Sequence, residues 1–98
     1  MFTLKIHKEH VEEPDTPNLI TENYETEENA VKAALCEITE DNGVFTSKEE
    51  MEKVKKELEL GEYIDEKQNK TYTIEKSRTR DYMVADYTWE YFYEPPDA

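Results

Sequence analysis

The apolar residues of this chain change their spacing at Gly61, and no other feature of the sequence constrains the fold more. Between Thr26 and Gly61 they recur every three or four residues, as on one face of a helix. After Gly61 they alternate with polar residues, as in a half-buried strand. The chain also begins with alternation, since polar residues separate Phe2, Leu4 and Ile6. The sequence therefore predicts strands at both ends and helices between them.

Two helices are predicted in the middle of the chain. Thr26 is the expected N-cap of the first, and Asn42-Gly43 stops it because glycine accepts the left-handed conformation that ends many helices. Ser47-Lys48-Glu49-Glu50 has the spacing of a capping box and opens the second helix, which Gly61 ends. Both apolar stripes are narrow: they consist of Val31, Ala34, Leu35 and Ile38, and of Met51, Val54 and Leu58.

Three strands are predicted after the helices. A short one begins at Tyr63-Ile64, and a second contains Tyr72 and Ile74 after a turn at residues 68–70. The third has the longest alternation in the chain and runs from Met83 to Tyr93. Its core-facing residues are expected to include Met83, Ala85, Tyr87 and Trp89.

Residues 8–23 contain two prolines and little periodicity, which predicts a loop with a short extended piece at residues 19–21. Helices with such narrow stripes cannot bury one another fully, so both are expected on one face of an antiparallel sheet. The predicted fold is α+β, with about four strands and two helices in the order β-α-α-β-β-β. Residues 1–98 form one domain with a mobile acidic loop at residues 9–23. The first strand can pair with the long last one, although the sequence leaves the strand order open.

Negative charge is concentrated in two tracts that contain no lysine or arginine. The formal net charge is −13; residues 9–31 hold eight acids and residues 81–98 hold five. Such tracts create strong local fields, which select partners. They disfavour direct binding to nucleic-acid phosphates or to anionic membrane surfaces. The eleven aromatic residues indicate a folded domain, because disordered acidic chains are usually poor in them.

The sequence contains no catalytic or metal-binding motif. Cys36 is the only cysteine, so an intrachain disulfide is excluded, and neighbouring acids discourage its ionisation to a thiolate. His7 and His10 have no second cluster that would complete a metal site. Asp41-Asn42-Gly43 lacks the further ligands of a calcium loop and is interpreted as a helix stop. We therefore expect a protein without enzymatic activity, cofactor or metal.

The last segment carries more aromatic residues than two short helices can cover. Tyrosine and tryptophan beside carboxylates are typical of interfaces, because they bring large contact area at low entropic cost. The expected contact residues of this segment are Asp86, Glu90, Tyr91, Tyr93 and Glu94. In the acidic loop they are Glu12, Glu13 and Asp15.

This chemistry favours a protein that blocks a basic groove. Duplex DNA presents one negative charge per ~1.7 Å of its axis, and proteins that bind it carry grooves of lysine and arginine. In its size, its acid tracts at 9–28 and 81–97 and its tyrosine-rich end, the chain resembles small phage-encoded anti-defence inhibitors. These are anti-CRISPR proteins and DNA-mimic inhibitors of restriction enzymes. The resemblance implies an inhibitor of a host nuclease or similar protein, and the lysines of the second helix favour partial rather than complete mimicry.

The alternative is a generic interaction or assembly module, for example a homodimer that pairs through the last strand. Both a monomer and a homodimer fit the sequence. The N-terminus lacks the continuous apolar stretch of a signal peptide, and nothing downstream approaches a membrane span. A cytoplasmic location is therefore expected, in the host cell if a phage encodes the protein.

Overall fold

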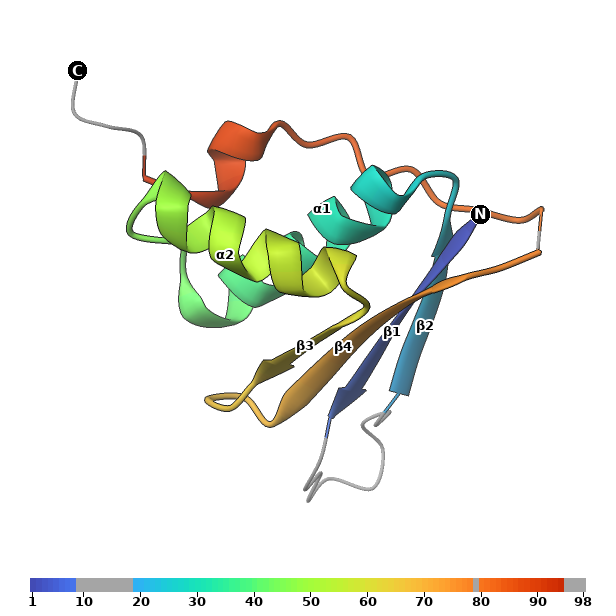
Figure 1. The fold of residues 1–98 in the computed structure, drawn as a ribbon, viewed down its shortest axis with the longest axis horizontal. Helices are drawn as coiled ribbons and strands as arrows, with labels where there is room; N and C mark the ends of the chain where they lie inside the picture. The colour runs from blue at the N-terminus through green and yellow to red at the C-terminus, as the bar shows by residue number, and fades with distance from the viewer. Residues whose placement is uncertain (9–18, 79, 95–98) are drawn as a thin grey trace.

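The computed structural model of the chain describes residues 1–8, 19–78 and 80–94. Six regular elements and one 3-10 helix follow one another along the chain (Figure 1). They are β1 (Phe2–Lys8), β2 (Leu19–Tyr24), α1 (Glu27–Asn42), α2 (Lys48–Glu59), β3 (Glu62–Asp65), β4 (Lys70–Lys76) and η1 (Trp89–Phe92).

The four strands form one antiparallel sheet in the order β2-β1-β4-β3, and both helices lie over one face of it (Figure 1). The predicted α+β class, with four antiparallel strands and two helices on one face, is confirmed. The predicted order of elements is wrong, because a second strand precedes the helices and no long strand ends the described chain.

Strand β2 lies almost entirely within the predicted loop at residues 8–23. The extended piece expected at residues 19–21 is real but continues to Tyr24, and its six residues pair with β1. The sequence does not reveal the full strand because β2 lies at the edge of the sheet, where Leu19 and Ile20 remain exposed. Its residues therefore show no alternation of apolar and polar positions. Residues 9–18, the remainder of that predicted loop, lie outside the described residues.

The predicted strand from Met83 to Tyr93 is wrong. Strand β1 already has β2 on one side and β4 on the other, so it offers no edge to a further strand. Instead the segment makes only two isolated bridges, Met83 to Tyr24 and Tyr93 to Phe45, and coils into η1 between them. Among its aromatic residues, Phe92 and Tyr93 are buried, whereas Tyr87 and Tyr91 remain exposed.

Both helices begin and end as predicted. Thr26 Oγ1 accepts a hydrogen bond from the N–H of Asn29 at 3.1 Å, and Ser47 Oγ accepts one from the N–H of Glu50 at 3.2 Å. The Glu50 carboxylate reaches back to Thr46, one residue before the cap. Helix α1 ends at Gly43, whose φ of 85° is accessible to glycine and whose N–H bonds to the Thr39 carbonyl at 2.8 Å.

The core lies between the sheet and the two helices. Every predicted stripe residue of the helices is buried: Val31, Ala34, Leu35, Ile38, Met51, Val54 and Leu58. From the sheet, Leu4, Ile6 and Tyr72 face them. Burial of each large apolar side chain stabilises the fold by about 1.5–3 kcal/mol, which makes these stripes the main reason the layers stay together.

A partly buried ion cluster fastens the β3–β4 hairpin to the end of α1. The Lys70 ammonium lies 2.6 Å from Asp41 Oδ2 and 3.3 Å from Glu37 Oε1. Asn42 donates a hydrogen bond of 2.7 Å to Asp65, which is itself buried. Burial alone would lower the pKa of Lys70, but the hydrogen bonds to Asp41 and Glu37 outweigh it and raise that pKa.

Tyr72 is completely buried beside this cluster, and its hydroxyl has no hydrogen-bond partner among the described residues. Burial, followed by the nearby Asp41 and Asp65 carboxylates, raises the pKa of Tyr72. A buried hydroxyl without a partner carries an uncompensated desolvation penalty.

We predict that Tyr72→Phe increases the free energy of unfolding by about 1 kcal/mol, because it removes that penalty while keeping the ring. Urea unfolding followed by circular dichroism measures the change. Tyr63→Phe is the matched control, since Tyr63 is only half-buried and packs 6.1 Å from Tyr72, and its effect should be small. A loss of stability in Tyr72→Phe would contradict the prediction.

Candidate partner-binding site

Residues 81–94, termed the strap, cross the helices on the side away from the sheet (Figure 1). The strap is fastened at both ends by backbone hydrogen bonds. At its start Met83 N–H donates to the Asn23 carbonyl at 2.6 Å. At its end Phe45 N–H donates to the Phe92 carbonyl at 2.9 Å, and Glu94 N–H donates to the Phe45 carbonyl at 2.8 Å. The segment is therefore a fixed part of the surface.

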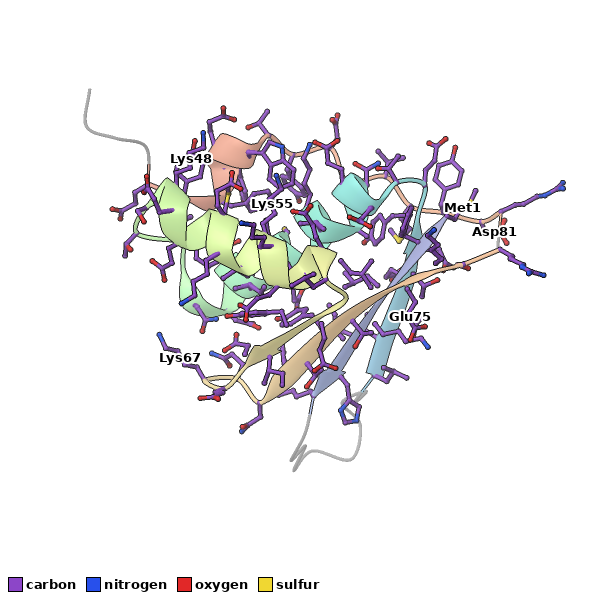
Figure 2. All side chains as sticks on the ribbon, in the orientation of Figure 1. Met1, Lys48, Lys55, Lys67, Glu75 and Asp81 are labelled. Carbon is purple, nitrogen blue, oxygen red and sulfur yellow. The ribbon has the colours of Figure 1, made fainter. Side chains whose placement is uncertain are left out.

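Side chains hold the middle of the strap against the helices. Phe92 is completely buried and Ala85 nearly so, and both belong to the main core cluster. Trp89 is half-buried between the helices, with Lys55 Nζ 4.3 Å and Lys32 Nζ 4.9 Å from its ring (Figure 2 labels Lys55). Each such cation–π contact adds about 0.5–1 kcal/mol at an exposed site.

Two tyrosines form an exposed aromatic pair on this scaffold. The rings of Tyr87 and Tyr91 are 5.1 Å apart, and 54% of Tyr91 is exposed. Both rings also contact Phe92, at 5.9 and 5.5 Å. Because Phe92 is buried in the core, it holds the two tyrosine rings in place. A partner that binds this pair therefore loses little free energy to the ordering of side chains.

Carboxylates flank the tyrosine pair along the chain. Asp86, Glu90 and Glu94 are all exposed on the strap. Of the contact residues predicted from the sequence, Asp86, Glu90, Tyr91 and Glu94 are thus exposed on the strap. Tyr93 is only 8% exposed and packs into the core. Glu12, Glu13 and Asp15 lie outside the described residues.

Other exposed residues of the strap were missed by the sequence interpretation. Met83 and Tyr87 were assigned to the core, but both are exposed, as are Tyr82 and Val84. The alternation predicts a strand with one buried face, whereas these residues form no strand and no such face exists. The excess of aromatic residues over the available cover predicts exposed aromatics at the end of this segment; Tyr91 is exposed, but Phe92 and Tyr93 are buried.

Cys36 is a half-buried thiol within hydrogen-bonding reach of Tyr87. Its Sγ is 3.6 Å from Glu40 Oε1. Burial is the largest influence and raises the pKa of Cys36; a hydrogen bond with Tyr87 acts in the opposite direction, while Glu40 and Glu37 raise it further. Such a thiol is a poor nucleophile, because the thiolate is the reactive form.

Among the described residues, no three His, Cys, Asp or Glu side chains are placed to hold a metal ion. Asn42 and Gly43 are occupied in structural roles, the first bound to Asp65 and the second capping α1, which confirms the interpretation of residues 41–43 as a helix stop. No helix in the described part of the chain is long and apolar enough to cross a membrane.

Comparison with family models, with curated proteins and with solved structures finds no match to this chain.

We predict that Phe92→Ala destabilises the protein by about 3 kcal/mol or more, because Phe92 anchors the strap in the core. Unfolding followed by fluorescence reports on the strap directly, since Trp89 is the only tryptophan. Tyr91→Ala is the control: its ring is exposed, so its effect should stay below about 1 kcal/mol. Equal effects of the two substitutions would show that Phe92 is no anchor.

We predict that Cys36 reacts slowly with iodoacetamide and reaches half its maximal rate at a higher pH than a cysteine in an unstructured peptide. The raised pKa, caused first by burial, keeps the thiol protonated. Tyr87→Phe removes the hydrogen bond that opposes this shift, so the half-maximal pH should rise further. A rate equal to that of the peptide in the folded protein would contradict the burial argument.

Proposed function

We propose that this protein is a non-enzymatic acidic inhibitor that binds the basic nucleic-acid-binding groove of another protein. The observation that carries the proposal is the strap, on which exposed carboxylates at Asp86, Glu90 and Glu94 accompany the rigid pair Tyr87 and Tyr91. Carboxylates compete with phosphates for lysine and arginine, and the tyrosines supply apolar contact area and faces for arginine.

The charge of the whole chain supports the same partner. A net charge of −13 steers a basic protein towards this one and accelerates association, in the way that DNA itself is attracted. Helix α2 adds exposed lysines at Lys48, Lys53 and Lys56, so its surface does not imitate a duplex. We therefore propose partial blocking of a groove rather than mimicry by the entire surface.

The resemblance to phage anti-defence inhibitors fits this chemistry and suggests a nuclease as the partner. The inhibitor would then act in the cytoplasm of the host cell. The target itself would supply the basic groove, and the strap would occupy part of the path of the nucleic acid.

A generic interaction module is the second candidate, because Tyr82, Met83 and Val84 expose apolar area beside the acidic part of the strap. Dimerisation through the last strand was the route predicted from the sequence. That route is lost, since residues 83–93 form no strand that could pair with a second copy.

We predict that Asp86→Lys combined with Glu90→Lys weakens capture of a nucleic-acid-binding protein about tenfold or more at low salt, because both charges face the partner's cations. Affinity capture with and without competing duplex DNA measures this. Glu49→Lys with Glu57→Lys makes the same change in net charge at exposed positions of α2 and should have a much smaller effect. Equal losses in the two double variants would reduce the proposal to non-specific attraction.

A further inference from the structure

The two edges of the sheet are not equally covered. At the β2 edge the strap pairs with the Tyr24 end, through the bond from Met83 N–H to the Asn23 carbonyl. At the β3 edge no segment of the described chain pairs with the outer side of residues 62–65. Strand β3 therefore presents unpaired backbone groups, which can accept a further strand.

The hydrogen-bond pattern shows which groups these are. Ile74 N–H donates to the Gly61 carbonyl at 3.0 Å, so Gly61 faces β4. Successive residues of an antiparallel strand face opposite sides, which directs Tyr63 and Asp65 to β4 as well. The N–H and C=O groups of Glu62 and Ile64 consequently point outwards, away from the sheet.

A groove runs beside this edge. It has a volume of about 450 Å³ and lies between β3 and the loop that joins α1 to α2, close to the hairpin tip that Lys67 marks in Figure 2. Val44 and Phe45 line it from the loop, and Tyr63 and Ile64 line it from the strand. Ile64 is 56% exposed and Val44 46%, so apolar area is available to a ligand.

The wall opposite β3 is already rigid. Phe45 uses both its backbone groups in hydrogen bonds to Phe92 and Glu94 of the strap. A segment that enters the groove thus meets two fixed walls and need not order either of them.

Charge decides what kind of segment fits. Glu62 and Glu66 are exposed at this edge of the sheet, next to one lysine, Lys67. A second copy of β3 would bring the exposed Glu62 and Glu66 of the two chains close together, and each copy carries a net charge of −13. Repulsion between these carboxylates disfavours pairing of β3 with a second copy of itself. A strand that carries lysine or arginine would instead be attracted to them.

We propose that the β3 edge and this groove bind an extended, basic segment of a partner protein by strand addition. The segment forms backbone hydrogen bonds with Glu62 and Ile64, as in other cases of β-augmentation. Its side chains alternate: those opposite Tyr63 and Asp65 enter the groove and are apolar, and those between them are basic and lie near Glu62 and Glu66. This inference does not depend on the function proposed for the strap.

A terminally blocked peptide of seven alternating lysines and valines is the probe. In nuclear magnetic resonance spectra of the labelled protein, we expect it to shift the Glu62 and Ile64 amides and to slow their hydrogen exchange at least tenfold. The Thr21 amide is the internal control. It also faces outwards, on the β2 edge, because the Asn23 carbonyl two residues later is directed to Met83. A peptide of alternating glutamate and valine should leave all three amides unchanged.

Two proline variants test the backbone directly. Ile64→Pro removes the outward N–H at an edge position, where proline is tolerated, and should abolish peptide binding. Thr21→Pro makes the same change on the other edge and should leave binding intact. Glu66→Lys, an exposed substitution in the turn, should weaken binding at least threefold and remains informative if Ile64→Pro does not fold.

The proposal is overturned if the peptide does not bind, if it protects Thr21 as strongly as Ile64, or if the glutamate peptide binds equally well. It is also overturned if folded Ile64→Pro, or Glu66→Lys, binds like the unaltered protein. Asp86→Lys with Glu90→Lys should retain peptide binding, so this proposal and the one for the strap can fail separately.

Discussion

The fold depends on covering helix α1 from two sides. Its residues Ala30, Val31, Ala34 and Leu35 are at most 1% exposed, which requires apolar neighbours over more than one narrow stripe. The sheet provides one layer through β1, β2 and β4, while α2 and η1 provide the rest. Without the strap, part of α1 would face water. The strap is therefore a structural layer first, and its outer surface is available for binding because its inner surface is needed for stability.

The helix ends and the buried faces of the helices were predicted correctly, because interactions between residues close in sequence determine them. Thr26, Ser47 and Gly43 act at the helix ends within one turn of their own positions, so their chemistry is visible in a short window. The stripes of α1 and α2 were likewise visible, because each depends on one helix. The strand β2 was not, since an edge strand with exposed Leu19 and Ile20 lacks the pattern that burial imposes.

The last segment shows the limit of pattern more clearly. Its alternation from Met83 to Tyr93 has the period of a strand, yet a strand also needs an unoccupied edge beside it. Strand β2 occupies the position next to β1. This long-range pairing cannot be inferred from the sequence of residues 83–93. Tyr91 is nevertheless exposed, as expected, and so are Asp86 and Glu90. That expectation depended on how much aromatic surface two short helices can cover, and not on whether the segment forms a strand.

Phe45 connects the two candidate surfaces. Its backbone holds the end of the strap, and its side chain lines the groove beside β3. The loop at residues 43–46 cannot move away from the groove without breaking the hydrogen bonds to Phe92 and Glu94 that anchor the strap. Phe92 also contacts the rings of Tyr87 and Tyr91. The contacts between Phe45 and the end of the strap therefore help to hold both the groove and the tyrosine pair in place. A ligand in the groove would therefore stabilise the seat of the tyrosine pair, and a partner on the strap would stabilise the wall of the groove.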